Sequence, residues 1–346
     1  MAERQIAGID EKGIAGWMTE RVEEVELPLA FERITGGLSN MTFSMSDAAG
    51  HRWVLRRPPL HGVQQSAHDM AREHRIMKAL RASAVPVPPV VGECDDLDVI
   101  GAPFFVMRYV DGIVLRNAHV VTAETNEATR TRACESMVDT LVALHDIAPD
   151  DVGLGDLGRH EHYCARQLRR WLGQWEKVHT RDVAEISQIH DRLSADIPAQ
   201  QDTSIVHGDY RLDNLILRSG GTVAAVVDWE LCTLGDPLAD LGTLYVYWRD
   251  PADDVRSLPN SMGDQHGFLS KRELVARYGQ MSGRDLSDLD FYVALAYWRL
   301  AIILEGVYSR FSSGAYGDMP DGVDTFDRTV PALARAALDT AERAGR

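Results

Sequence analysis

Short runs of hydrophobic and polar residues dominate the first third of the chain, and their lengths are typical of β-strands. One helical pattern interrupts them, because Met70, Met77 and Leu80 recur at helical spacing within Val63–Ala82. Prolines between Val85 and Val91 exclude a helix and favour extended backbone. The expected strands are Phe43–Ser46 and Arg52–Arg57, joined by the turn Asp47–Gly50, and the continuously apolar run Phe104–Val110.

From about Glu124 the hydrophobic positions recur mainly at helical spacing, with a compact strand segment in the middle. The expected helices are one that contains Met137–His145, then Arg159–Val178 and Asp182–Asp196, and further helices from Pro237 onward. The expected strands are Ser204–His207, Leu215–Leu217 and Val223–Asp228, and Leu258–Gly267 is expected as a flexible surface loop. The pattern predicts an α+β chain with a small β-rich lobe over residues 1–110 and a larger, mostly helical lobe over residues 111–346.

The net charge and the apolar stretches limit the classes of binding partner that the chain is expected to have. The 346 residues hold 36 lysines and arginines against 52 aspartates and glutamates, a net charge of −16. That balance argues against a nucleic-acid partner, because binding to phosphates needs a basic surface. No secretory leader is visible, and the most apolar stretch, Ala294–Leu304, is about half a membrane span and contains Arg299. We therefore expect a cytoplasmic protein with no membrane partner.

The segment from His207 to Asn214, HGDYRLDN, carries the most specific chemical signal. Asp209 and Asn214 have the spacing of a kinase catalytic loop, in which the aspartate receives the proton of the substrate hydroxyl and the asparagine binds a metal ion. The hairpin that follows should bring Asn214 beside Asp228, since antiparallel strands pair around its turn. Two oxygen ligands suit Mg²⁺, which takes its remaining ligands from phosphate and water.

Two other interpretations of this segment remain open. The segment is also compatible with a turn capped by Asp209. Alternatively, His207, Asp209 and Asp228 form a transition-metal site in a hydrolase.

Arg56 and Glu73 form a second candidate constellation. Glu73 lies on the apolar side of the predicted helix, where an unpaired carboxylate is costly, so it requires a cation. Arg56 at the end of a predicted strand is the candidate, and the order of strand cation and helix glutamate matches the kinase pair that positions phosphates. Arg57 is the other candidate, although its side chain should face the opposite side of the strand. The alternative is a surface pairing of Glu73 with its helix neighbours.

The segment Thr35–Asn40 contains Gly36 and Gly37 immediately before a predicted strand. Backbone N–H groups of such a turn can cover nucleotide phosphates, and Ser39 and Asn40 add side-chain donors. A glycine pair is also common in ordinary turns, and only its position upstream of Arg56 favours phosphate binding.

Asp236 and Asp240 follow the predicted hairpin. Asp236 precedes a proline, which is typical of a helix N-cap. Asp240 is a candidate anchor for the backbone of the catalytic loop.

The motifs HGDYRLDNLIL, VVDWELCTLGDPLADLG, ITGGLSNMTF and WVLRRPP together resemble the aminoglycoside phosphotransferase-like kinases. The resemblance covers about Ile34 to Leu244 and is strongest to the branch that resembles the kinase-like domain of acyl-CoA dehydrogenase family members 10 and 11. It implies a protein-kinase-like two-lobed fold and transfer of a phosphoryl group from ATP, or GTP, with Mg²⁺ to a small-molecule hydroxyl.

Residue by residue, the resemblance implies Asp209 as the base and Asn214 and Asp228 as metal ligands. The segment Met107–Val110 resembles the hinge that holds the nucleotide base. Met107 and Tyr109 are the residues of this segment that are expected to contact the nucleotide. Arg56 stands where most members have lysine, and arginine is a larger, permanently charged group that can bind phosphate with two N–H groups.

The acceptor is the least specified part of the prediction. The resemblance favours a hydroxyacyl-CoA or hydroxy-acid metabolite over an antibiotic. Aromatic and basic residues of the helical part are candidates for the acceptor pocket, although aromatic residues at helical spacing are usually core: Tyr245, Tyr247, Trp248, Arg249, Tyr292, Trp298 and Arg299. The alternative function is a nucleotide-binding pseudokinase without phosphotransfer activity.

Overall fold

The computed structural model describes residues 6–34, 40–60, 69–250, 253, 262–312 and 322–345. The chain divides into two compact units. The first unit comprises Met1–Gly112 together with Ala224–Glu230, and the second comprises Ile113–Val223 together with Leu231–Arg346.

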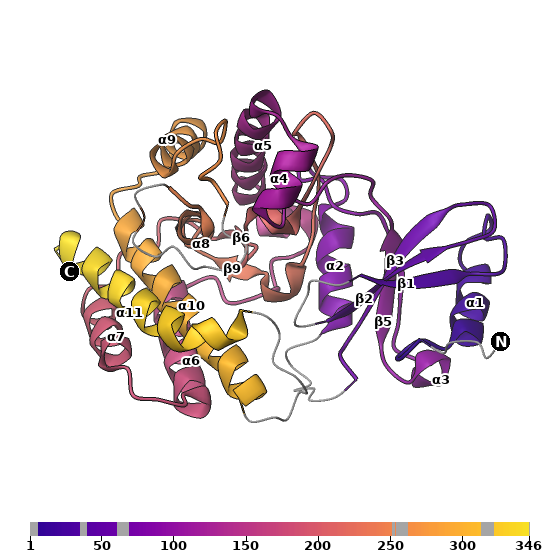
Figure 1. The fold of residues 1–346 in the computed structure, drawn as a ribbon, viewed down its shortest axis with the longest axis horizontal. Helices are drawn as coiled ribbons and strands as arrows, with labels where there is room; N and C mark the ends of the chain where they lie inside the picture. The colour runs from indigo at the N-terminus through magenta and orange to yellow at the C-terminus, as the bar shows by residue number, and fades with distance from the viewer. Residues whose placement is uncertain are drawn as a thin grey trace. The chain divides into compact units, whose positions relative to one another are not determined.

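The first unit is built on a five-stranded antiparallel sheet with the order β1-β2-β3-β5-β4 (Figure 1). Its elements are α1 (Glu11–Thr19), β1 (Ala30–Ile34), β2 (Met41–Ser46), β3 (Arg52–Arg57), α2 (Met70–Leu80), β4 (Val90–Cys94), α3 (Leu97–Ile100) and β5 (Phe104–Arg108). The predicted strands β2, β3 and β5 are confirmed, whereas α1, β1 and β4 were not predicted.

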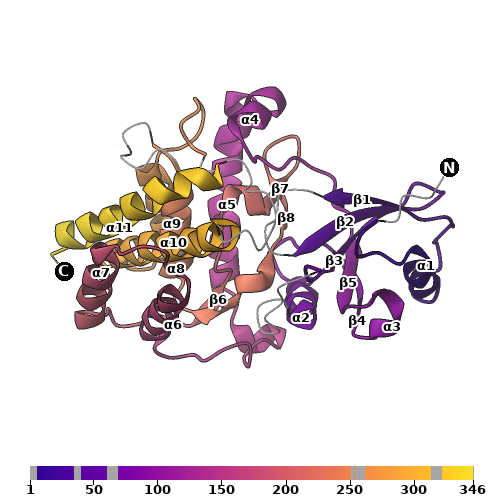
Figure 2. The same ribbon diagram turned by 60° about the horizontal axis from the view of Figure 1, so that its bottom comes forward.

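Successive strand residues point to opposite sides of this sheet, so each face presents its own set of side chains. A different helix packs on each face. Phe43 and Leu55 are partners across β2 and β3, and both pack into an apolar cluster with Trp17 of α1. Helix α2 lies against β4 and β5 on the other side (Figure 2). Helix α2 begins later than predicted, since Asp69 is extended and accepts a hydrogen bond from the Arg72 N–H at 2.9 Å. Residues 63–68 of the predicted helix lie outside the described residues.

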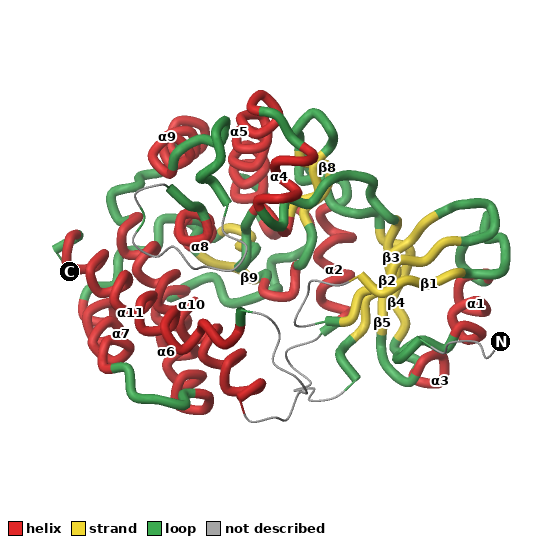
Figure 3. The backbone as a smooth tube through the Cα atoms, viewed as in Figure 1, coloured by secondary structure: helices red, strands yellow, loops and turns green. Residues whose placement is uncertain are grey.

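The second unit is mainly helical (Figure 3). Its helices are α4 (Ala118–Glu124), α5 (Glu127–His145), α6 (Tyr163–Val178), α7 (Ala184–Ala195), α8 (Leu238–Tyr247), α9 (Lys271–Ser282), α10 (Leu289–Ser312) and α11 (Phe326–Arg343). Helix α10 packs against α6, α8 and α11 and is buried along most of its length. Short strands accompany these helices: β6 (Ser204–Val206) pairs with β9 (Thr233–Gly235), and β7 (Leu215–Leu217) follows β6 in the chain. Strand β8 (Val223–Val226) belongs to the first unit from Ala224 onward.

The segment predicted as a flexible surface loop, Leu258–Gly267, is held in place where the structure describes it. Residues 258–261 lie outside the described residues. Met262 is buried, and its carbonyl oxygen accepts the Arg249 N–H at 2.8 Å. The carbonyl oxygen of Gly267 accepts the Thr131 hydroxyl at 2.7 Å. Met262–Gly267 contains no helix or strand, and Asp264 and His266 are exposed, in agreement with a surface loop, whereas the apolar Met262 is buried. The flexibility of the segment stays a prediction.

Helix α10 is the one helix in the described part of the chain that is long and apolar enough to cross a membrane. Its most apolar window is 78% buried inside the structure, as in the core helix of a globular protein.

Candidate active site

Arg56 is the centre of a charged cluster in the first unit. Its Nη1 lies 3.2 Å from Oε1 of Glu73 on α2, and its Nη2 lies 2.8 Å from Oδ1 of Asp228. Nη2 also lies 3.9 Å from Oε2 of Glu230. The predicted pairing of Arg56 with Glu73 is confirmed. The structure adds two carboxylates to it, because Ala224–Glu230 belongs to this unit despite its distance in sequence.

Local backbone geometry presents Asp228 to Arg56. The residue has φ +69°, a left-handed conformation that few non-glycine residues adopt and that aspartate tolerates better than most. The next residue, Trp229, is completely buried, and its indole N–H donates to the carbonyl oxygen of Val226 at 3.0 Å. The Val226 N–H donates in turn to the Pro86 carbonyl oxygen at 2.8 Å. These bonds fix the turn that carries the carboxylate.

Burial controls the electrostatics of the cluster. Glu73 is 2% exposed, and burial raises its pKa to about 7. Arg56 opposes that rise, while the Asp228 carboxylate adds to it. Burial alone would lower the pKa of Arg56, but the charges of Glu73 and Asp228 raise it above its ordinary value. Arg56 is therefore a permanently charged group, and the Glu73 charge depends on what else occupies the cluster.

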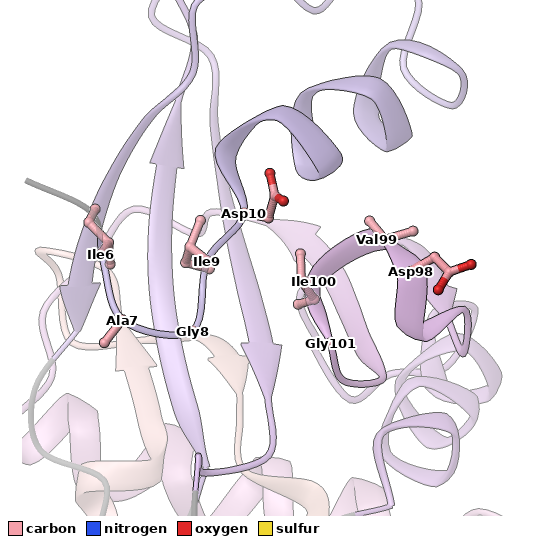
Figure 4. A pocket seen from close by; sticks show the side chains of 9 residues that line it. All are labelled: Ile6, Ala7, Gly8, Ile9, Asp10, Asp98, Val99, Ile100 and Gly101. Carbon is pink, nitrogen blue, oxygen red and sulfur yellow. The ribbon is translucent and has the colours of Figure 1, made fainter. Parts of the chain in front are cut away.

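Arg57 faces the opposite side of the sheet, as its position in the strand predicts. Its guanidinium donates to the carbonyl oxygens of Gly8 at 2.6 Å and Ile100 at 3.5 Å. These two residues help to line a pocket of about 490 Å³ between the N-terminal segment and α3 (Figure 4). The pocket is separate from the Arg56 cluster, because residues 56 and 57 point to opposite faces of β3.

Asn40 lies at the start of β2 and joins the charged cluster. Its Nδ2 donates to Oε2 of Glu230 at 3.0 Å, and the side chain is largely buried. The other residues predicted to contact phosphate, Gly36, Gly37 and Ser39, lie outside the described residues.

The predicted hinge lies at the end of β5. Met107 is buried and is the strand partner of Val54. The Tyr109 N–H donates to the Arg52 carbonyl oxygen at 3.1 Å, and the Arg52 guanidinium lies 4.0 Å from the Tyr109 ring centroid. Base binding at Met107 and Tyr109 stays a prediction.

In the second unit, the loop from His207 to Asn214 folds around Asp209. The Asn214 amide donates to the carbonyl oxygen of Asp209 at 2.8 Å and to its Oδ2 at 2.9 Å. The Asp209 N–H is bonded to Nδ1 of the fully buried His207 at 3.2 Å. These contacts hold the carboxylate within a short loop while leaving it 22% exposed.

Arg211 is a residue of this loop that the sequence reasoning missed. Its Nε lies 3.1 Å from Oδ2 of Asp209 and 3.1 Å from Oδ1 of Asp213. Its guanidinium lies 4.6 Å from the centroid of the Tyr247 ring. The contact fixes the orientation of the Asp209 carboxylate. A cation two residues after the aspartate was the available sequence signal.

Asp240 anchors the backbone of this loop, as the sequence suggested. Its two carboxylate oxygens accept the N–H groups of His207 at 2.7 Å and Gly208 at 2.8 Å. His145 Nε2 lies 3.3 Å from Oδ2 of the same carboxylate. Burial alone would raise the pKa of Asp240, but His145 and the loop hold it below its ordinary value. The loop is thus bound to a buried, ionised carboxylate.

Three comparisons relate this chain to known proteins. The phosphotransferase enzyme family matches residues 30–292. The chain belongs to that family.

The chain is similar in sequence to several curated proteins. Acyl-CoA dehydrogenase family member 11 of Gallus gallus is 32% identical over 91% of the chain, and that of Homo sapiens is 30% identical over 96%. Member 10 of Mus musculus is 33% identical over 83%. The chain spans 41%, 43% and 27% of the lengths of these relatives. The resemblance inferred from the motifs is confirmed.

Solved structures confirm the kinase-like fold. A putative aminoglycoside phosphotransferase from Ralstonia eutropha superimposes with a TM-score of 0.80 at 32% identity, covering 96% of this chain and 98% of the other. The GDP complex of aminoglycoside 2′-phosphotransferase-IIIa superimposes with a TM-score of 0.63 at 13% identity, covering 94% and 99%. The second likeness shows the fold alone.

Most of the aromatic residues that were candidates for the acceptor pocket belong to the core of the second unit. Trp248, Tyr292 and Trp298 are buried, and the Trp298 indole N–H donates to the Ile186 carbonyl oxygen at 2.9 Å. Arg299 also has a structural partner, since its Nη2 donates to the Gly208 carbonyl oxygen at 2.6 Å. The remaining candidates, Tyr245, Tyr247 and Arg249, are only partly buried.

Asp236 is also structural. Its Oδ1 accepts the Leu238 N–H at 3.0 Å, and its Oδ2 accepts the Gln201 N–H at 3.3 Å. The N-cap of α8 is Pro237, one residue later than predicted. Burial raises its pKa.

The side chains of Asn214 and Asp228 fit the chemistry of a magnesium ligand pair. Both N–H bonds of the Asn214 amide are directed to Asp209, so its carbonyl oxygen is the atom left to meet a cation. The pair thus offers amide and carboxylate oxygens, which Mg²⁺ prefers. No group of three or more His, Cys, Asp or Glu side chains in the described ranges has the geometry of a metal site. The expected closeness of Asn214 and Asp228 involves both units and stays a prediction.

Proposed function

We propose that this phosphotransferase transfers the γ-phosphoryl group of ATP, or of GTP, to a hydroxyl group of a small molecule in a Mg²⁺-dependent reaction. The observation that carries the proposal is the cluster around Arg56. Two carboxylates lie within hydrogen-bonding distance of the Arg56 guanidinium, which is the proposed phosphate-binding cation. They are Glu73 of α2 and Asp228, which is predicted to bind metal. Nε of Arg56 is buried without a hydrogen-bond partner in the described residues, which suits a phosphate oxygen.

Asp209 is proposed as the residue that accepts the hydroxyl proton. Its carboxylate is oriented by Asn214 and Arg211, and its backbone is held by the loop that Asp240 anchors. Because phosphoryl transfer has a loose transition state, the contribution of Asp209 is chiefly to orient the hydroxyl and to take its proton.

Asn214 and Asp228 are proposed as the residues that hold Mg²⁺. When bound, the ion neutralises charge on the phosphate oxygens. Arg56 adds a second positive charge and binds the phosphates. Met107, Tyr109 and the segment with Gly36, Gly37, Ser39 and Asn40 are proposed to hold the rest of the nucleotide.

A hydroxyacyl-CoA or a related hydroxy acid is the proposed acceptor. The support is the identity of about one third to acyl-CoA dehydrogenase family members 10 and 11, which share most of this chain. Aminoglycosides are the competing acceptors, because the solved relatives include an aminoglycoside phosphotransferase in complex with hygromycin B.

The test is nucleoside diphosphate release with ATP or GTP, Mg²⁺ and panels of hydroxyacyl-CoAs, free hydroxy acids and aminoglycosides. Phosphorylated product should appear by mass spectrometry with a hydroxyacyl-CoA or hydroxy acid, and Asp209→Asn should abolish most of it. Nucleotide binding without product from any panel would favour the pseudokinase. Absence of nucleotide binding would refute both functions.

A further inference from the structure

Glu230 connects two parts of the candidate nucleotide site. Its Oε2 accepts the hydrogen bond from Asn40 Nδ2 at 3.0 Å and lies 3.9 Å from Nη2 of Arg56. One carboxylate oxygen therefore contacts the residue that closes the glycine-containing segment and approaches the cation of β3. The three residues come from sequence positions up to 190 residues apart, and all belong to the first unit.

These three side chains are held on fixed backbone. Asn40 directly precedes β2, where Met41 is the strand partner of Arg57. Glu230 follows the buried Trp229 in the 3₁₀ turn Trp229–Leu231. Asn40 is 8% exposed, as is Arg56, and the Glu230 side chain is 20% exposed. A hydrogen bond between largely buried groups on fixed backbone can transmit position from one to the other.

An arginine suits this arrangement better than a lysine. A guanidinium has a planar fork of five N–H groups, whereas an ammonium is one compact charge. Arg56 directs Nη1 to Glu73 and Nη2 toward Asp228 and Glu230, and its Nε has no partner in the described part of the chain. The fork can therefore hold its carboxylates and keep an N–H group for a ligand.

We propose that Glu230 is a positioning residue for nucleotide binding, which links Asn40 to Arg56 and thereby orients the guanidinium and the Asn40 amide toward the phosphates. The inference rests on the proposed function. It adds a residue to the site and a physical role for the arginine at position 56.

The direction in which nucleotide affinity changes on removal of Glu230 distinguishes a positioning role from a purely electrostatic effect of its charge. A carboxylate near a phosphate-binding cation repels the phosphates, so its removal should strengthen nucleotide binding if Glu230 does nothing else. If Glu230 positions Arg56 and Asn40, its removal should weaken binding.

The experiment is isothermal titration of the full chain with AMP-PNP and Mg²⁺. The variants are Glu230→Ala, Asn40→Ala, their double variant, and Glu230→Gln, which keeps an acceptor for Asn40 but loses the charge. We expect Kd to rise about tenfold in Glu230→Ala, and the double variant to bind no more weakly than the weaker single variant, as for residues of one network. Glu230→Gln should fall between wild type and Glu230→Ala. Glu32→Gln, which removes one exposed carboxylate from β1, should leave Kd unchanged.

Thermal unfolding without nucleotide identifies variants that fail to fold. If Glu230→Ala fails to fold, the binding measurement on Glu230→Gln still tests the proposal. In an Arg56→Lys background, the Glu230→Gln effect should shrink, because lysine lacks the fork. Tighter or equal binding in the Glu230 variants, or additive effects of Asn40→Ala and Glu230→Ala, would overturn the inference alone. Failure of the wild-type chain to bind AMP-PNP, ATP or GTP would overturn the proposed function as well.

Discussion

Replacement of Asp240 by asparagine should destabilise the loop from His207 to Asn214 without changing the shape of the side chain. The carboxylate is completely buried and accepts backbone N–H groups of His207 and Gly208 at 2.7 and 2.8 Å. An asparagine keeps one acceptor oxygen but places an NH₂ group against the other N–H donor. One charge-assisted hydrogen bond is lost, the other is weakened, and a buried donor is left unpaired.

The expected loss in the free energy of unfolding follows from the charge-assisted hydrogen bonds that Asp240 accepts. Hydrogen bonds to charged groups contribute about 1.5–3 kcal/mol each, and breaking a buried charged network costs about 3–5 kcal/mol. We therefore expect the free energy of unfolding to fall by about 3–5 kcal/mol in Asp240→Asn. The loop also carries Asp209, and a displacement of about 1 Å can reduce turnover about 10²-fold.

Urea unfolding and nucleoside diphosphate release measure these two effects. Asp139→Asn is the matched control, because Asp139 pairs with Arg277 at 2.7 Å but is 41% exposed. It should cost at most about 1 kcal/mol and leave turnover unchanged. If Asp240→Asn unfolded at the wild-type urea concentration with wild-type turnover, Asp240 would not anchor the loop.

Two further predictions test the site. Asp209→Asn should keep nucleotide affinity and lower turnover about 10²–10⁴-fold. Asp228→Asn should lower turnover and also weaken Mg²⁺-dependent nucleotide binding. Equal nucleotide affinity of the two variants in calorimetry would contradict these roles. Glu73 has a raised pKa in the folded chain, so it retains a proton that the unfolded chain loses between about pH 4.5 and 7. Its contribution to the free energy of unfolding is therefore present at low pH and lost as the pH rises through that range. The wild-type free energy of unfolding, relative to Glu73→Gln, should fall by about 1–3 kcal/mol from pH 5 to pH 8, and a difference independent of pH in urea titrations would refute the raised pKa.

Local patterns were sufficient for the elements with strong periodicity. Strand β2 alternates buried and half-buried residues, β3 and β5 are buried along most of their lengths, and α5 buries residues at helical spacing, so the hydrophobic pattern predicted all four. Strand β1 was missed because all of its residues are exposed or half-buried, so its sequence has no alternation to detect. Strand β4 was missed because its register shifts between Val90 and Gly92, which interrupts the period of two.

The pairing of Arg56 with Glu73 could be predicted because each side chain lies on a predictable face of its own element, and a buried carboxylate requires a cation. The spacing within the motif likewise indicated Asp209 and Asn214, which are bonded to each other across a loop of six residues. In these cases the sequence by itself was enough to predict the contact, since the direction of each side chain depends on the geometry of its own element or loop.

Only the tertiary structure decided which distant residues complete the site. Glu230 meets Asn40 across 190 positions, and Asp240 meets His207 across 33. Tertiary packing also buried Tyr292 and Trp298, which removed them from the acceptor candidates. Such contacts depend on how helices and strands pack together, and the spacing of residues along one element carries no information about the partner that the fold places opposite it.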